Sequence, residues 1–187
     1  GESVFVNGGA GNVGSSILAI AKALGARIAV TASSPEKAAW CRSLGADLVI
    51  DYRRENVREA LREFAPSGVD VYFDTTRKFD GELAVESLAR RGRIVVIAGL
   101  DARTQLPVGR FYQRNATMFG FTVTDATVEE LASYAAEINR WLACGVLKAR
   151  IAAHLPLSQA AEAHRMYEAG GLFGKIVLTP DGDVHAD

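Results

Sequence analysis

Three glycines with a fixed spacing, Gly9, Gly11 and Gly14, are the first residues that could do chemistry. They follow a short β-branched run and open a segment whose apolar residues recur at helical spacing. In that setting the first glycine permits a tight turn, the second leaves room for a pyrophosphate, and the third lets the helix pack on the strand. The free N–H groups and the dipole of the helix face the anion. We therefore predict that this loop, including Asn12 and Val13, holds a dinucleotide.

The residues after the second predicted strand distinguish between possible ligands. The loop alone leaves two alternatives to a dinucleotide site. It could be a glycine-rich turn that binds nothing, or the first loop of a methyltransferase. A free ribose diol is normally held by Asp or Glu about 20 residues after the loop, but here the sequence reads Ser33-Ser34-Pro35-Glu36-Lys37. Two hydroxyls and an ammonium could hold a 2′-phosphate, which favours NADP(H) over NAD(H) and S-adenosylmethionine. In the alternative, Ser34 only caps a helix and Lys37 is solvated.

The elements that must position these residues follow from the alternation of short apolar runs with helical segments. This alternation predicts a Rossmann-type α/β fold, a doubly wound, parallel six-stranded sheet with helices on both faces. The predicted strands are 4–6, 28–30, 48–50, 69–73, 94–97 and 117–123. The predicted helices are 13–24, 35–44, 55–64, 81–88, 128–142 and 158–168, followed by a strand over 175–178. We divide the chain into an NADP(H)-binding domain, 1–149, and a helix-strand appendage, 150–187.

Composition and charge narrow the function classes. Apolar residues make up 49% and charged residues 23%, as in soluble globular proteins, and no apolar run approaches the roughly 20 residues of a membrane-spanning helix. The 21 basic and 22 acidic residues are spread along the chain, which argues against nucleic acid as a partner. Because no cationic leader precedes an apolar stretch, we expect a cytoplasmic protein.

The cysteines and histidines do not form a metal-binding pattern. Cys41 and Cys144 lack C-x-x-C spacing, and we expect reduced thiols that are buried or half-buried. The histidines also lack metal-ligand spacing; they are His154, His164 and His185. We therefore expect no metal site in this chain.

Seven short motifs occur in an order that resembles one protein family. They are Asn7-Gly8-Gly9-Ala10-Gly11-Asn12-Val13-Gly14, Thr31-Ala32-Ser33-Ser34-Pro35-Glu36-Lys37, Leu44-Gly45-Ala46-Asp47, Val49-Ile50-Asp51-Tyr52, Gly92-Arg93-Ile94-Val95, Ala163-His164-Arg165 and Phe173-Gly174-Lys175-Ile176-Val177-Leu178. The chain resembles the cofactor domain of the medium-chain dehydrogenase/reductase superfamily, in its zinc-independent quinone oxidoreductase and enoyl reductase branch. The resemblance covers nearly the whole chain.

The resemblance implies roles for further residues. It implies that Ser33, Ser34 and Lys37 meet the 2′-phosphate and that Tyr52 lies by the adenosine end. It also implies that two strand ends approach the ribose and nicotinamide, and these are Thr75-Thr76 and Ala98-Gly99-Leu100. Ligands beyond the carboxyl ends of parallel strands agree with this placement.

Three features depart from that family. Asn12 replaces a frequent glycine, which Asn tolerates because it visits left-handed conformations readily. Thr75-Thr76-Arg77-Lys78 replaces a small glycine-containing turn and adds bulk and two positive charges near the nicotinamide end. Relatives carry an N-terminal substrate domain of GroES-like fold, which has no counterpart here, so we expect an excised domain or a missing upstream portion. The tail residues that would then lack an apolar partner are Ile151, Leu155, Leu157, Ile176 and Leu178.

The sequence identifies no catalytic residue, because hydride transfer is chemistry of the cofactor. Three functions are compatible with the residues described above. We predict a domain of an NADPH-dependent oxidoreductase that reduces quinones or conjugated enones. The alternatives are an enoyl reductase module of a polyketide or fatty-acid synthase, in which Lys37 could donate a proton, and a non-catalytic NADPH-binding protein. The edge of the sixth strand, 117–123, predicts a homodimer.

Overall fold

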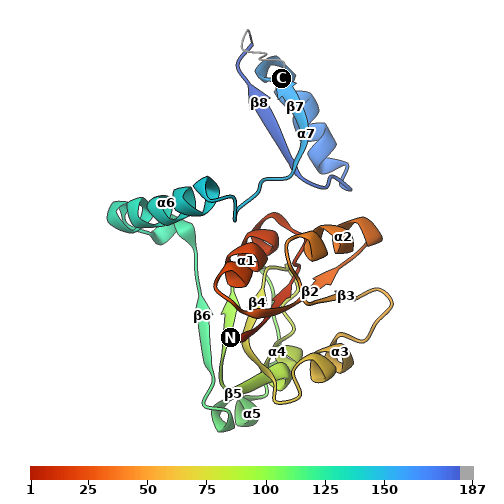
Figure 1. Cartoon of the computed structure of the whole chain (residues 1–187), viewed down its shortest axis with the longest axis vertical. Helices are drawn as coiled ribbons and strands as arrows, with labels where there is room; N and C mark the ends of the chain where they lie inside the picture. The colour runs from red at the N-terminus through yellow and green to blue at the C-terminus, as the bar shows by residue number, and fades with distance from the viewer. Residues whose placement is uncertain (182–187) are drawn as a thin grey trace. The chain divides into compact units, whose positions relative to one another are not determined.

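The structure of the protein is a computed structural model that describes residues 1–181 (Figure 1). The chain forms two compact units, Gly1–Leu147 and a second unit that begins at Lys148. We keep the division into a cofactor-binding domain and an appendage as a proposal. Within residues 1–181, no helix combines the length and the apolar character needed to span a bilayer.

The first unit is built on a parallel sheet that confirms the predicted fold class. Its strands are β1 (Ser3–Asn7), β2 (Arg27–Ala32), β3 (Leu48–Asp51), β4 (Val69–Asp74), β5 (Leu88–Val96) and β6 (Thr117–Gly120). Their order is β3-β2-β1-β4-β5-β6, and all neighbours are parallel. The strand order therefore reverses between β1 and β4. Ligands of open α/β sheets bind beyond the carboxyl ends of the strands at such a reversal.

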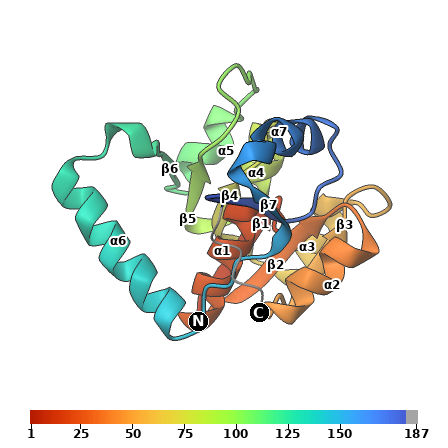
Figure 2. The same cartoon turned by 90° about the horizontal axis from the view of Figure 1, so that it is seen from above.

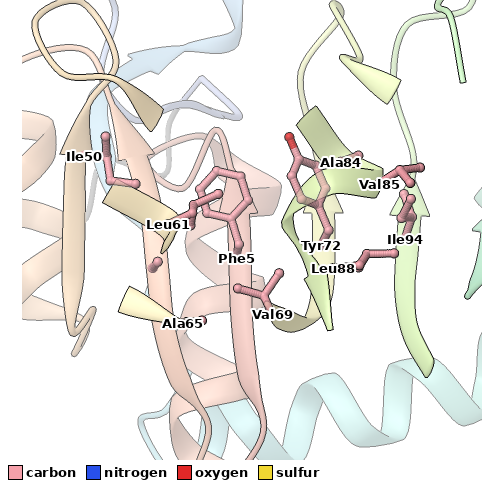
Figure 3. Packing of buried hydrophobic residues seen from close by; sticks show 11 residues of the cluster. Phe5, Ile50, Leu61, Ala65, Val69, Tyr72, Ala84, Val85, Leu88 and Ile94 are labelled. Carbon is pink, nitrogen blue, oxygen red and sulfur yellow. The ribbon is translucent and has the colours of Figure 1, made fainter. Parts of the chain in front are cut away.

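Helices cover both faces of this sheet, which explains why the central residues of β1 and β2 are apolar on both faces. The helices of the first unit are α1 (Asn12–Ala23), α2 (Pro35–Ser43), α3 (Val57–Phe64), α4 (Gly81–Ser87), α5 (Val108–Gln113) and α6 (Val128–Ala143). Leu18 of α1 and Cys41 of α2 pack with alternate residues of β1 and β2 on one face. On the other face, α3 and α4 pack against a cluster centred on Phe5 and Tyr72 (Figure 3). Helix α6 has no buried residue, and its ribbon stands away from the sheet in Figure 2.

Several boundaries differ from the sequence prediction for local reasons. Helix α3 starts at Val57 because the Asn56 side chain accepts hydrogen bonds at its N-terminus. Strand β5 already begins at Leu88, so Gly92 lies inside a strand. Strand β6 ends at Gly120 rather than at residue 123, because the chain turns into a 3-10 helix over Val123–Asp125. The prediction missed α5, which at six residues is too short to show helical periodicity.

The second unit contains a strand that the sequence prediction missed. Strand β7 (Ile151–Pro156) pairs in parallel with β8 (Lys175–Thr179), and α7 (Ala160–Glu168) connects them. The appendage is therefore strand-helix-strand rather than helix-strand. Of the apolar residues expected to lack a partner, three are exposed and two are half-buried; the exposed ones are Ile151, Leu157 and Leu178. Helix α7 begins two residues later than predicted, after a 3-10 turn over Leu157–Gln159.

Candidate dinucleotide-binding site

The glycine loop joins β1 to α1 at the carboxyl edge of the sheet (Figure 1). A Cβ on Gly9 would lie 2.4 Å from the Cβ of Val30, and a Cβ on Gly14 would lie 2.2 Å from the carbonyl oxygen of Gly8. Gly11 is exposed, and a Cβ there would lie 3.3 Å from that same oxygen. Packing therefore requires glycine at positions 9 and 14, whereas at position 11 the missing Cβ leaves the outer surface of the loop open.

The tight turn of the loop is made by Gly8. Its φ is +88°, a left-handed conformation that glycine adopts without strain. A Cβ there would lie 2.5 Å from Oγ1 of Thr75. In the pattern Gly9-x-Gly11-x-x-Gly14 the first glycine is the one assigned to the tight turn, so the spacing points to Gly9 instead. Gly8 is therefore a position where the backbone of the loop requires glycine and which the spacing does not reveal.

The first turn of α1 presents backbone N–H groups at the loop. The N-cap residue Gly11 offers no side-chain acceptor, and the first turn contains no acidic residue. Asn12 and Val13 begin the helix and are exposed. The first N–H groups of a helix lack intrahelical partners, and the helix dipole adds partial positive charge there. This end of α1 can therefore accept an anion.

The tip of β2 brings Ser33, Ser34 and Lys37 together. Ser34 is the N-cap of α2, and its hydroxyl accepts a hydrogen bond from the backbone N–H of Lys37 at 3.3 Å. The Lys37 Nζ donates to Ser33 Oγ at 3.4 Å. Ser34 is thus a helix cap, as the alternative interpretation holds, but the Lys37 ammonium turns back to the strand tip rather than into solvent.

Tyr52 stands at the neighbouring strand tip. Ala32 at the end of β2 pairs with Asp51 at the end of β3. Ser33 and Tyr52 therefore follow adjacent strands at the same edge of the sheet. The Tyr52 residue is 51% exposed, so its ring is accessible to a ligand that occupies the β2 tip.

A polar network that the sequence analysis missed connects three strand tips to the loop. Asp74 is fully buried and accepts hydrogen bonds from Asn7 Nδ2 at 2.9 Å and from the N–H and Oγ1 of Thr76 at 2.8 Å each. Thr31 Oγ1 donates to Asn7 Oδ1 and accepts from the N–H of Gly8, both at 2.8 Å. The network fixes the loop against β1, β2 and β4. Its signal in the sequence is a polar residue at or next to the carboxyl end of each of these strands.

The turn after β4 is tied down by its own hydroxyl groups. Thr75 Oγ1 donates to the carbonyl oxygen of Asn7 at 2.8 Å, and Thr76 Oγ1 donates to Asp74. Arg77 and Lys78 are exposed. Thr75 therefore ties this turn to the end of β1 and Thr76 satisfies the Asp74 carboxylate, while the two positive charges remain at the surface of this edge.

A cleft of about 1040 Å³ lies beyond the tips of β5 and β6. It brings together four of the predicted site residues, which are Val13, Ala98, Gly99 and Leu100. Its far side contains Phe121 and Tyr134, whose rings form an edge-to-face pair with centroids 6.3 Å apart. The sequence analysis missed this side, although the aromatic and apolar residues directly after β6 were a usable signal. The other predicted residues stand in the glycine loop and at the β2, β3 and β4 tips, and they do not line this cleft.

The cysteines and histidines lie outside this arrangement. His154 and His164 are exposed residues of the second unit, and His185 lies outside the described residues. Within residues 1–181, no group of three or more His, Cys, Asp or Glu side chains could hold a metal ion. Burial raises the pKa of the Cys41 thiol to about 11. Cys144 is exposed, which corrects the prediction that both thiols would be at least half-buried; α6, which it follows, has no buried face.

The strand order, the reversal at β1 and β4, and the glycine loop that opens α1 define a Rossmann-type dinucleotide-binding domain. The sequence profile of a family described as zinc-binding dehydrogenase matches residues 12–138. The chain belongs to this family. Within the medium-chain dehydrogenase/reductase superfamily it is a cofactor-binding domain of the zinc-independent quinone oxidoreductase branch.

Individual relatives agree with this placement. Human quinone oxidoreductase is 28% identical over 180 residues, which cover 95% of this chain and 54% of that protein. Phthioceranic/hydroxyphthioceranic acid synthase of Mycobacterium tuberculosis is 32% identical over 95% of this chain and 9% of its own length. The crystal structure of Escherichia coli quinone oxidoreductase complexed with NADPH superposes with a TM-score of 0.79 at 29% identity, covering 96% of this chain and 57% of that one. The chain thus spans about half the length of the quinone oxidoreductases that it matches.

Proposed function

We propose that this chain binds NADP(H) and is the cofactor-binding domain of an oxidoreductase that reduces quinones or conjugated enones. The observation that carries the proposal is the Lys37 ammonium beside Ser33 at the tip of β2, on the same edge of the sheet as the glycine loop. A 2′-phosphate is the group that distinguishes NADP(H) from NAD(H), and an ammonium with hydroxyl neighbours suits it. The E. coli quinone oxidoreductase complex with NADPH supports the choice of cofactor.

Each part of the cofactor would meet a different group of residues. The pyrophosphate would lie at the N-terminus of α1, where the missing Cβ of Gly11 leaves space. The 2′-phosphate would lie among Ser33, Ser34 and Lys37, with Tyr52 beside the adenosine. The other end would pass Thr75 and Thr76 and reach the cleft beside Ala98, Gly99 and Leu100. The bound nicotinamide supplies the hydride chemistry, so these residues need to hold and orient it.

The cleft beyond β5 and β6 suits an apolar acceptor. Phe121 and Tyr134 form its aromatic side, and Val13 and Leu100 add aliphatic surface. Aromatic and aliphatic walls favour a flat, weakly polar substrate. A quinone and a conjugated enone both meet this description.

The test is consumption of NADPH by the full-length gene product, followed at the absorbance of the reduced nicotinamide. We expect turnover with a simple quinone or enone and much weaker turnover when NADH replaces NADPH. Equal turnover with both cofactors would contradict the NADP(H) assignment. If NADPH is turned over with neither a quinone nor an enone, the substrate assignment is contradicted.

A second candidate is an enoyl reductase module of a polyketide or fatty-acid synthase. The observation that favours it is the 32% identity with a segment of the mycobacterial acid synthase. Turnover of an enoyl thioester but not of a quinone would support this candidate. Tight NADPH binding without turnover of either acceptor would instead support a non-catalytic NADPH-binding protein.

We also propose that two copies pair through the edge of β6. Strand β6 is the last strand of the sheet and pairs with β5. All four of its residues are exposed, including Met118 and Phe119. Unpaired edges with apolar side chains favour strand pairing between copies. Light scattering should show a dimer, and a monomer at high protein concentration would rule this proposal out.

A further inference from the structure

A second cavity, of about 710 Å³, opens at the amino edge of the sheet, at the opposite ends of the strands from the glycine loop. It lies among α3, the end of α4, and α5. Its floor includes Leu61, Ala65 and Leu88, which belong to the core cluster shown in Figure 3. None of the residues assigned to the cofactor lines this cavity. Any ligand that it holds is therefore separate from the proposed NADP(H) site.

The charge of this cavity is strongly one-sided. Four arginines line it, and Glu86 is the one acidic residue among its lining residues. Both Arg58 of α3 and Arg110 of α5 form ion pairs with the Glu86 carboxylate, whose side chain is 14% exposed. Four guanidinium groups and one carboxylate line the cavity, so three positive charges are in excess. Like charges around a common space repel one another, and an anion that enters would relieve that repulsion.

The other two arginines are placed differently from this pair. Arg114 Nη2 donates to the carbonyl oxygen of Glu86 at 3.2 Å, and its Nη1 donates to the carbonyl oxygen of Leu88. Its guanidinium is thereby held at the cavity. Arg62 follows Arg58 by one helical turn, so both lie on the same face of α3. In the part of the chain that the structure describes, Arg62 forms no ion pair.

We propose that this cavity binds a small anion that carries phosphate groups. A guanidinium presents a planar fork of N–H donors that matches two phosphate oxygens, and it stays charged at all relevant pH values. Three neutral donors line the same cavity and can complete the coordination; they are Ser67, Ser87 and Gln113. A single carboxylate would neutralise one of the three excess charges, whereas a pyrophosphate brings several. The excess of charge therefore favours a multiply charged phosphate.

The test is a titration of the chain with inorganic pyrophosphate at an ionic strength of about 0.15 M, where surface electrostatics are screened. Arginine Nε–Hε signals and backbone amide signals are followed in the same NMR spectra. We expect saturable shifts of the Nε–Hε signals of the four cavity arginines. Shifts of the glycine-loop amides report any pyrophosphate bound at the cofactor site, so the two sites are measured separately.

Arg62→Gln is the informative variant, because it removes a charge while the ion pairs of Glu86 remain. We expect it to weaken pyrophosphate binding in the cavity about 10-fold or more, as for loss of a charge-assisted contact. The matched control is Arg140→Gln, which removes an exposed arginine of α6 that pairs with Glu137; it should leave the affinity unchanged. Absence of saturable shifts at the cavity arginines, or equal affinity of Arg62→Gln and the parent chain, would overturn the proposal.

Discussion

Replacement of Lys37 by alanine is the sharpest test of the proposed cofactor. The ammonium lies 3.4 Å from Ser33 Oγ, and the residue is half-buried at the tip of β2. The cap of α2 uses the backbone N–H of Lys37 and the hydroxyl of Ser34, so Lys37→Ala keeps that hydrogen bond. We therefore expect the free energy of unfolding to change by less than about 0.5 kcal/mol, as for most surface substitutions.

The expected loss of NADPH affinity follows from this geometry. Two unit charges about 4 Å apart interact by roughly 4 kcal/mol at the effective dielectric constant of a protein surface. Desolvation of the ammonium and ordering of the lysine side chain oppose this attraction. Measured charge-assisted contacts accordingly contribute about 1 to 3 kcal/mol. Lys37→Ala should thus raise the Kd for NADPH by about 5-fold to 150-fold, with little change for NADH, which has no 2′-phosphate.

Isothermal titration calorimetry of the chain with NADPH and NADH measures both constants directly. Lys22→Ala is a matched control, because Lys22 pairs with Asp47 at 2.9 Å near the end of α1, away from the glycine loop. It should alter neither constant. Equal losses of NADPH and NADH affinity in Lys37→Ala would refute the 2′-phosphate assignment. Unchanged binding with lost turnover in the full-length protein would instead indicate that Lys37 donates a proton.

Three further predictions concern the loop, the network and the core. Gly14→Ala should prevent stable folding of the first unit, because its methyl group would overlap a loop carbonyl, whereas Gly11→Ala should fold and bind NADPH weakly. Asp74→Asn should lower the free energy of unfolding by about 1.5 to 3 kcal/mol, because its amide must face one of the present donors, and it should also weaken NADPH binding. Tyr72→Phe should raise the free energy of unfolding by roughly 1 kcal/mol, because the buried hydroxyl has no hydrogen-bond partner among the described residues. Urea denaturation and calorimetric titration measure these effects.

Each of these predictions has a result that contradicts it. A Gly14→Ala chain as stable as the parent would show that α1 does not pack as closely as described. Asp70→Asn is the control for the network, because Asp70 also accepts hydrogen bonds from the β1 residue Ser3, but at the amino edge. Equal effects of Asp70→Asn and Asp74→Asn on NADPH affinity would show that the network around Asp74 does not position the glycine loop for NADPH. Destabilisation by Tyr72→Phe would mean that the phenol has a partner.

The sequence predicts the sheet and the glycine loop well, because their signals are local. Apolar runs mark the strands, and the spacing of Gly9, Gly11 and Gly14 marks the loop. The need for glycine at position 8 is different, since it arises from a backbone φ and from a threonine 67 residues later in the chain. Neither quantity is encoded in the spacing of neighbouring residues.

Strand β7 and the aromatic side of the cleft were not predicted from the sequence, also for physical reasons. Strand β7 contains Ala152, Ala153 and Pro156, so it lacks the β-branched run by which strands were recognised. The aromatic side of the cleft forms when Phe121 meets Tyr134 of α6, and such a contact between two elements is not visible in either one alone. The sequence therefore names the residues of the glycine loop but not those of the aromatic side of the cleft.

The structure gives a physical reason why the Thr75-Thr76-Arg77-Lys78 turn differs from the small turn of the family. As sequence, it adds bulk where relatives of the family have a small turn. In the structure, the Thr75 hydroxyl ties the turn to the end of β1, and Thr76 supplies two of the three hydrogen bonds to the buried Asp74. A buried carboxylate is costly unless donors satisfy it, so glycine at position 76 would leave Asp74 with one donor fewer. The bulk of this turn is therefore a structural requirement of the network that positions the glycine loop, and the charges of Arg77 and Lys78 remain exposed at the carboxyl edge of the sheet.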